Sequence, residues 1–138
     1  MNIFFTAAIR GGRAQQPEYA SIVKALEQYG TVFSKHVADD ALSQVGETDI
    51  SNKEILEREV SALEKSDVVI AEVTTPAHGV GYLIGRATSL GKRVIALHQG
   101  EFVLKLTGII QGDPGVEVYA YKTDEDIEKI LKKTLGEV

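Results

Sequence analysis

Short apolar runs alternate along the chain with segments in which apolar residues recur at helical spacing. The runs NIFFTAAI and DVVIAEV are typical of buried parallel strands. Ser51 or Asn52 can cap the start of one helix, and Thr123 with Asp126 has the pattern of a capping box at another. In chain order, the pattern predicts strands at residues 2–9, 31–37, 67–73, 93–98 and 116–121, helices at 17–29, 52–65, 79–90, 102–110 and 124–135, and a polar loop at 38–48.

Five strands separated by helices indicate an α/β fold. We expect one domain over residues 1–138, with a flavodoxin-like, doubly wound, five-stranded parallel sheet of strand order 2-1-3-4-5. Ligands of such sheets bind beyond the carboxyl ends of the strands, where strands 1 and 3 lie side by side. The loops at residues 8–13, 73–81 and 98–102 are therefore the first places to look for a site.

Composition excludes several classes of protein. The 138 residues are 43% hydrophobic, which suffices for the core of one domain and is too much for a disordered chain. There is no cysteine, so disulfides and cysteine nucleophiles are excluded. No apolar run is long enough to cross a bilayer, and the N-terminus lacks the features of a signal peptide. We expect a cytoplasmic protein that does not bind membranes.

Net charge makes a nucleic-acid partner unexpected. Lys and Arg number 15 and Asp and Glu number 20, which gives a net charge of −5. The basic residues form no stripe of the kind that duplex nucleic acids require. A small anion can still bind at one focused site.

The loop after the first predicted strand is suited to such an anion. Gly11 and Gly12 allow the backbone to approach a ligand closely, and Arg10 and Arg13 offer forked donors that match a phosphate. The alternative is a tight turn with two solvated arginines.

The loop after the third predicted strand enters a helix, whose N-terminal amides favour an anion. The spacing of Gly79, Gly81 and Gly85 is not a dinucleotide fingerprint, so these residues either hold a phosphate or pack closely. The three histidines (His36, His78 and His98) match no metal motif, so we expect polar lining and no metal site. Glu72 interrupts an apolar strand and must be paired or hydrogen-bonded, in a structural role or in the site lining.

Three segments together resemble the nucleoside 2-deoxyribosyltransferase superfamily, and in particular its 2′-deoxynucleoside 5′-monophosphate N-hydrolases. They read IRGGR at residues 9–13, KHVAD at 35–39, and AEVT at 71–74 leading into GVGYLIGRA at 79–87. The resemblance covers nearly the whole chain. It implies a deoxyribosyltransferase-like domain that binds a nucleoside 5′-monophosphate and cleaves the bond between base and sugar, without a cofactor.

The resemblance also implies that the catalytic centre has changed. In the family, a glutamate in GVGYE-x-GRA attacks the anomeric carbon and forms a covalent glycosyl-enzyme. Leu83 occupies this position, and an alkyl side chain cannot form an ester with a sugar. Glu59 aligns with a family aspartate that acts as an acid or orients the sugar. By its own pattern, Leu83 fits an ordinary apolar helix face.

Other family positions are partly changed and partly kept. Phe4 stands in place of a tyrosine near the sugar, Ala8 in place of a serine that faces the phosphate, and Ala77 in place of a serine before GVG. Thr107 takes the place of a serine that the neighbouring subunit contributes, which implies a homodimer. The expected catalytic residue is Glu59, with Leu83 marking the nucleophile position, and the expected substrate-binding residues are Phe4, Ala8, Arg10, Gly11, Gly12, Arg13, His36, Ala77, Gly79, Gly81 and Thr107.

Three functions therefore remain open. The first possibility is an N-glycosidase with weakened or altered chemistry, in which Glu59, Glu72 or an activated water replaces the covalent route. Alternatively, the chain is a nucleotide-binding sensor or scaffold of the same family without turnover. The third possibility is a flavodoxin-like phosphate-binding domain unrelated to this family.

Overall fold

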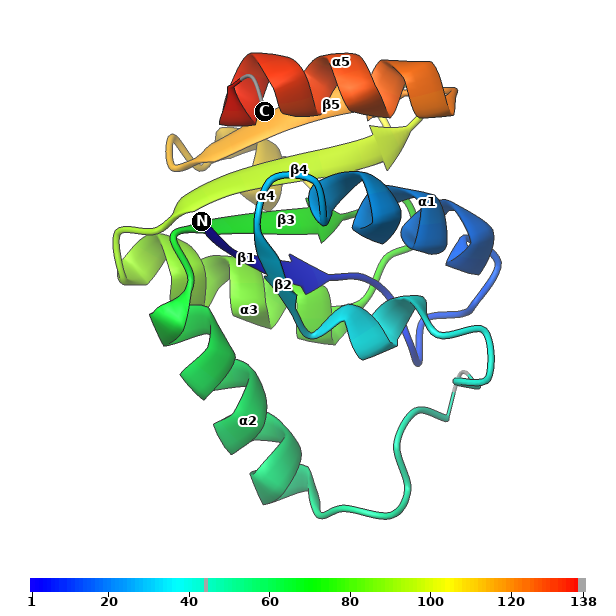
Figure 1. Cartoon of the computed structure of the whole chain (residues 1–138), viewed down its shortest axis with the longest axis vertical. Coiled ribbons are helices and arrows are strands. Elements are labelled where there is room, and N and C mark those ends of the chain that lie inside the picture. Colours follow the sequence, from blue (N-terminus) through cyan, green and yellow to red (C-terminus); the bar gives the residue numbers. More distant parts are fainter. Residues whose placement is uncertain (44, 137–138) are drawn as a thin grey trace.

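The computed structural model, which describes residues 1–43 and 45–136, contains a five-stranded parallel sheet (Figure 1). Gln44, Glu137 and Val138, which belong to the predicted loop and domain, lie outside the described residues. The observed strand order confirms the predicted 2-1-3-4-5 arrangement. Across the sheet, the strands are β2 (Thr31–Phe33), β1 (Asn2–Thr6), β3 (Val68–Glu72), β4 (Arg93–Gln99) and β5 (Val116–Tyr121).

Helices cover both faces of the sheet. α1 (Gln16–Leu26) and α5 (Asp124–Leu135) pack on one face, while α3 (His78–Ser89) and the end of α2 (Asn52–Lys65) pack on the other. The short α4 (Gly108–Gly112) also lies against this second face. Because parallel strands need crossover helices, alternating helices naturally produce this doubly wound arrangement.

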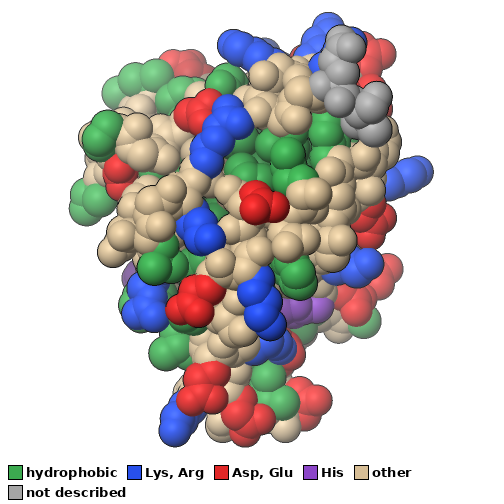
Figure 2. Space-filling model, turned by 60° about the vertical axis from the view of Figure 1, so that its left-hand side comes forward, with side chains coloured by type: hydrophobic (Ala, Val, Ile, Leu, Met, Phe, Trp, Pro, Cys, Tyr) green, Lys and Arg blue, Asp and Glu red, His purple; other side chains and the backbone are tan. Residues whose placement is uncertain are grey.

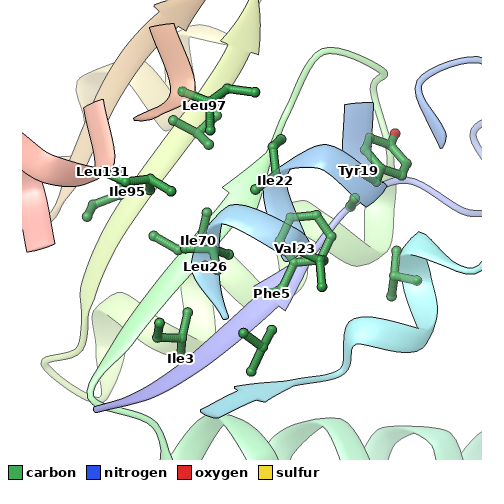
Figure 3. Close-up of a cluster of buried hydrophobic side chains, with 14 of the residues drawn as sticks. Ile3, Phe5, Tyr19, Ile22, Val23, Leu26, Ile70, Ile95, Leu97 and Leu131 are labelled. Carbon is green, nitrogen blue, oxygen red and sulfur yellow. The ribbon is translucent and has the colours of Figure 1, made fainter. Parts of the chain in front are cut away.

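The core on the α1 and α5 side is built from alternate strand residues. Ile3 and Phe5 of β1 are fully buried there, beside Ile70 of β3 and Ile95 of β4 (Figure 3). Phe4, which lies between the two β1 residues, points to the opposite core with α2 and α3. Successive side chains of a strand point to opposite faces of the sheet. A strand that is buried on both faces therefore has a continuous run of apolar residues in its sequence.

Two of the predicted helix starts are confirmed. The Ser51 hydroxyl accepts a hydrogen bond from the backbone N–H of Glu54 at 3.1 Å, where α2 begins. Thr123 and Asp126 form a reciprocal capping box at the start of α5. Both caps satisfy backbone donors that the first helical turn leaves without partners.

The strand predicted at residues 31–37 is wrong in its second half. β2 ends at Phe33, and Ser34 adopts a left-handed conformation with φ of 61°. A 3₁₀ helix, η1 (Lys35–Ala38), follows and contains His36. The left-handed residue turns the chain out of the extended path, so the apolar residues after it do not continue the strand.

Three further predicted elements are shorter than expected. The helix predicted at residues 17–29 ends at Leu26. β1 ends at Thr6, because the chain then leaves the sheet and turns where the N–H of Gly12 donates to the carbonyl of Ile9. The helix predicted at residues 102–110 begins only after Thr107, whose extended backbone and side-chain cap start α4. No helix among residues 1–43 and 45–136 has the length and hydropathy that a membrane crossing requires.

Candidate functional site

A cavity of about 630 Å³ opens at the carboxyl edge of the sheet, beyond β1. Its volume falls within the usual range for small-molecule sites. The loops after β1 and β3, the start of α3, η1 and α2 all contribute to its walls. Seven predicted site residues line it: Arg10, Gly11, His36, Glu59, Ala77, Gly79 and Leu83. The other six predicted positions do not: Phe4, Ala8, Gly12, Arg13, Gly81 and Thr107.

The two loops that flank the cavity touch at Gly11. A Cβ atom at Gly11 would lie 2.3 Å from the carbonyl oxygen of Pro76, a distance that no side chain can adopt. Gly12 has φ of +132°, which also favours glycine. The paired glycines therefore permit both a close approach of backbones and the turn that returns the chain towards α1.

The start of α3 leaves its first amides available to an anion. Ala77 is the N-cap, and it offers no side-chain hydrogen bond. The first helical turn carries no acidic residue, so the helix dipole favours negative charge at this end. A Cβ atom at Gly79 or Gly81 would meet nothing within 4 Å. Close packing within the described chain therefore does not explain these glycines.

The two loop arginines have different partners. Arg10 lines the cavity and donates from Nε to the carbonyl of Val45 at 3.1 Å. Arg13 does not line the cavity and uses its guanidinium to bind backbone carbonyls, from Nε to Leu42 at 2.9 Å and from Nη2 to Asp39 at 2.8 Å. Arg13 therefore ties the β1 loop to the segment after η1, and only Arg10 stands where a ligand phosphate could reach it.

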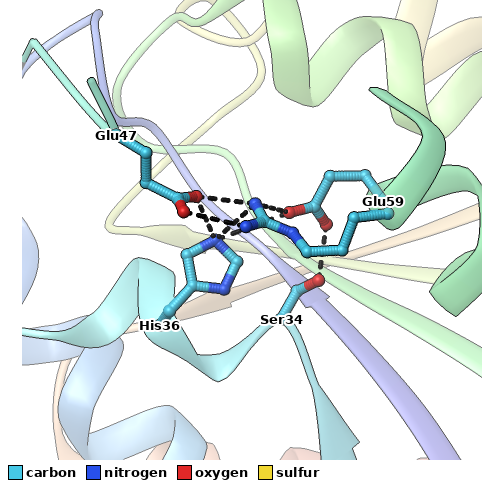
Figure 4. Close-up of polar contacts among 5 residues, drawn as sticks. Ser34, His36, Glu47 and Glu59 are labelled. Atoms are coloured by element: carbon cyan, nitrogen blue, oxygen red, sulfur yellow. Dashed lines mark hydrogen bonds and ion pairs between the residues drawn. The ribbon is translucent and has the colours of Figure 1, made fainter. Parts of the chain in front are cut away.

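A cluster of charged side chains lies at the α2 side of the cavity (Figure 4). Glu59 is 9% exposed, and its Oε2 accepts a hydrogen bond from the Ser34 hydroxyl at 2.5 Å. Its Oε1 accepts one from Nη2 of Arg58 at 2.8 Å. Each carboxyl oxygen of Glu59 is thus held by one side-chain hydrogen bond.

Arg58 joins Glu59 to a second carboxylate. Its Nη1 and Nη2 donate to the two oxygens of Glu47 at 2.8 and 2.6 Å, in a forked arrangement. Hydrogen bonding to Arg58 lowers the pKa of Glu47 below its ordinary value of 4.5. We call Ser34, His36, Glu47, Arg58 and Glu59 the acidic cluster.

His36 stands between the two carboxylates of the acidic cluster. Its Nε2 lies 3.2 Å from Arg58 Nη2, 3.2 Å from Glu47 Oε1 and 3.4 Å from Glu59 Oε1. An accepting Nε2 suits the arginine, and a donating Nε2 suits the carboxylates. The tautomer of this ring therefore decides which of these contacts is a hydrogen bond.

Leu83 lies on α3, lines the cavity and packs against the core around Val80 and Ile84. Leu83 therefore belongs to an apolar helix face and also reaches the candidate site, and its place as the family nucleophile position stays a prediction. An aliphatic side chain offers no lone pair for attack on a sugar carbon.

Three more predicted site residues lie in the core or on the surface. Phe4 and Ala8 are fully buried, and Thr107 is exposed as the N-cap of α4, accepting from the N–H of Ile109 at 3.3 Å. His78 lines the cavity, whereas His98 is buried and does not. Within the part of the chain that the structure describes, no three His, Cys, Asp or Glu side chains are placed to hold a metal ion.

Glu72 is hydrogen-bonded, as its position in an apolar strand requires. It is fully buried and does not line the cavity. Burial raises the pKa of its carboxyl group, while hydrogen bonds from Tyr121 and Thr74 lower it in part. This arrangement favours the structural interpretation of Glu72 over a place in the site lining.

Comparison with known proteins decides the family. A model described as nucleoside 2-deoxyribosyltransferase matches residues 3–126. The chain belongs to this family. A 5-hydroxymethyl-dUMP N-hydrolase of Danio rerio is 44% identical over 136 residues, which cover 96% of this chain and 94% of the relative. A 5-hydroxymethyl-dUMP N-hydrolase of Homo sapiens is 38% identical over 135 residues, covering 95% and 77%.

A solved structure shows the same fold. The CMP N-glycosidase of Clostridium botulinum superposes with a TM-score of 0.68 at 20% identity and covers 96% of this chain and 98% of that one. The two relatives are thus named as nucleotide N-hydrolases, and the solved structure shares the fold.

Sequence reasoning missed the partners of Glu59. Arg58 precedes Glu59 directly on α2, and Glu47 is 11 residues away from Arg58 in an irregular segment. No helical or strand periodicity links positions 47 and 58, so only the folded chain brings them together. The one available signal was an arginine next to the aligned carboxylate.

The pair of Arg58 and Glu47 is expected to stabilise the fold in a pH-dependent way. Because the pKa of Glu47 is lowered in the folded chain, the contribution is complete above about pH 4.5 and is lost as the pH falls further. Both side chains are partly exposed, so a coupling energy of about 1 kcal/mol is expected near pH 7. A double-mutant cycle with Glu47→Gln and Arg58→Met, followed by urea unfolding, measures it.

The exposed pair of Lys53 and Glu57 is the control for this cycle, since its side chains are 84% and 62% exposed. Its coupling should stay below about 0.5 kcal/mol. A coupling between Arg58 and Glu47 that is as large near pH 3.5 as near pH 7 would contradict the assignment.

Proposed function

We propose that this protein is an N-glycosidase that binds nucleoside or deoxynucleoside 5′-monophosphates and hydrolyses the bond between base and sugar by altered chemistry. The observation that carries the proposal is the cavity itself. An anion-binding end at Arg10 and the start of α3 shares one chamber with the carboxylate of Glu59. The names of the relatives support the same class of substrate.

The phosphate is assigned to the end of the cavity near α3. Arg10 can donate to it from the guanidinium, and Gly11 and Gly79 allow close approach of backbone amides. A phosphate there would compete with the carbonyl of Val45 for Arg10. Arg13 supports this end indirectly, because it fixes the loop that carries Arg10.

The sugar is assigned to the space between Leu83 and Glu59. Hydrolysis needs a nucleophile at the anomeric carbon, and the departing base takes the electron pair of the carbon–nitrogen bond. Leu83 cannot be the nucleophile, so water must attack. The carboxylate of Glu59 stabilises the positive charge that develops on the sugar, and it can accept the proton that water loses.

The second candidate function is nucleotide binding without turnover. It is favoured by Leu83, which removes the covalent route, and by the two donors that already occupy the oxygens of Glu59. Both oxygens of Glu59 are therefore already engaged in hydrogen bonds within the protein. Such a protein would act as a sensor or scaffold for nucleoside monophosphates.

We also propose that two copies of the chain form a homodimer through the segment before and within α4. Val103, Leu104 and Ile109 expose 61%, 93% and 86% of their surface, and Thr107 lies among them. Such apolar exposure is typical of an interface.

A cytoplasmic location and the absence of a nucleic-acid partner stay predictions. On the face shown in Figure 2, acidic and basic side chains are interspersed.

Monophosphate binding should depend on Arg10. Calorimetric titration is expected to show binding of a nucleoside 5′-monophosphate and at least about tenfold weaker binding by the Arg10→Gln variant, because a charge-assisted donor is lost. Lys53→Gln is the control, since it removes the same charge from a side chain that is 84% exposed and outside the cavity. No binding by the unchanged protein at about millimolar ligand would exclude both candidate functions.

The rate of base release should be low and should change when residue 59 or residue 83 is substituted. Chromatography is expected to detect free base, with at least about tenfold less from Glu59→Gln. Leu83→Glu should raise the rate by about 100-fold or more, because it restores a nucleophile, whereas Leu83→Gln should not. Monophosphate binding without any base release would favour the sensor or scaffold. Equal rates for Leu83→Glu and Leu83→Gln would show that position 83 does not face the reacting carbon.

Light scattering should give a mass of twice the 15.0 kDa of one chain. Leu104→Asp should produce the monomer, because it places a charge in the centre of the apolar surface. Leu56→Asp changes a 43% exposed residue of α2 and should leave the dimer intact. A monomeric unchanged protein would rule out this interface.

A further inference from the structure

A buried carboxylate joins the ends of three strands behind the loop that leads into α3. Glu72 is the last residue of β3, and no part of it is exposed. Its Oε1 accepts a hydrogen bond from the backbone N–H of Thr74 at 2.6 Å. Its Oε2 accepts from the hydroxyl of Thr74 at 3.0 Å and from the hydroxyl of Tyr121, at the end of β5, at 2.5 Å.

The threonine hydroxyl also connects Glu72 to β4. The backbone N–H of Gln99, the last residue of β4, donates to Oγ1 of Thr74 at 2.8 Å. The hydroxyl of Thr74 can donate its own proton to Glu72 at the same time. A backbone N–H can only donate, so the contact with the backbone of Thr74 requires an acceptor oxygen on residue 72.

Thr74 lies at the start of the loop between β3 and α3, and the far end of this loop lines the cavity. Two residues further on, the carbonyl of Pro76 contacts Gly11 in the opposite loop. Ala77 and Gly79 then line the cavity at the start of α3. The position of Thr74 therefore determines where this wall of the cavity lies.

The geometry points to Glu72 as a positioning residue for phosphate binding. It holds Thr74 in place, and through the loop it aligns the first amides of α3 with the bound phosphate. This role rests on the proposed function, because the aligned amides matter only if a monophosphate binds there. Glutamine at position 72 keeps the size of the side chain but turns one acceptor into a donor. That donor would face the two hydroxyls, because the N–H of Thr74 cannot accept a hydrogen bond. Each hydroxyl would then accept from residue 72, and its own proton would lose the acceptor that Glu72 provides, which is expected to weaken the hold on the loop.

Calorimetry with a nucleoside 5′-monophosphate and with the matching nucleoside tests this role in Glu72→Gln. The affinity for the monophosphate is expected to fall by about tenfold or more, while the affinity for the nucleoside changes by less than about twofold. A merely structural role would lower the melting temperature and affect both ligands alike. Unchanged or tighter monophosphate binding would overturn the proposal, since the loop would then not depend on the carboxyl group at position 72.

A second pair of variants leaves the carboxylate in place. Thr74→Val removes the hydroxyl that links Glu72 to Gln99, and Thr74→Ser keeps it. In the ligand-free protein, amide hydrogen exchange over residues 74–80 is expected to become faster by about tenfold or more in Thr74→Val and to stay near the original rate in Thr74→Ser. Equal exchange in both variants would overturn the proposal. Hydrogen exchange is measured without ligand, so it reports whether the loop depends on this network. Calorimetry on the unchanged protein reports separately whether a monophosphate binds at all.

Discussion

The parallel pairing of β1 with β3 is the constraint on which the rest of the molecule depends. Phe5 pairs with Ile70 and Thr6 with Ala71, deep in the core. The chain leaves β1 towards β2 on one side and leaves β3 towards β4 on the other. A crevice therefore remains beyond the two carboxyl ends, and the loops that start there must form its walls. Every candidate ligand contact follows from this divergence.

The crevice has two chemically different ends. Near α3, backbone amides, Arg10 and His78 favour an anion, and no acidic side chain stands in the first turn of the helix. Near α2, Glu59 and Glu47 bring negative charge, which Arg58 offsets only in part. Leu83 lies on the apolar wall of the same chamber. Under the proposed function, the anion-binding end would hold the phosphate of a nucleoside monophosphate, and Leu83 would leave the reaction without a covalent step.

The elements that depend on local patterns were predictable from the sequence. Buried parallel strands appear as apolar runs, and the capping box at Thr123 is encoded within four residues. Contacts between distant segments were not predictable. Arg13 looked like a phosphate ligand because it follows two glycines, but the segment at Asp39–Leu42 supplies it with carbonyl acceptors. The acidic cluster likewise exists only because Ser34 turns the chain into η1 beside α2. Family resemblance identified Glu59 and Leu83, and the fold then placed both at one cavity.

A structure of the protein with a bound nucleoside 5′-monophosphate would show whether this cavity binds and orients the nucleotide as proposed. We expect the phosphate to lie against the amides at the start of α3, with Arg10 turned towards it. We expect the anomeric carbon to lie between Leu83 and the carboxylate of Glu59, with space for a water molecule. A phosphate bound at the acidic cluster, or a sugar whose anomeric carbon lies far from both Leu83 and Glu59, would contradict the proposal.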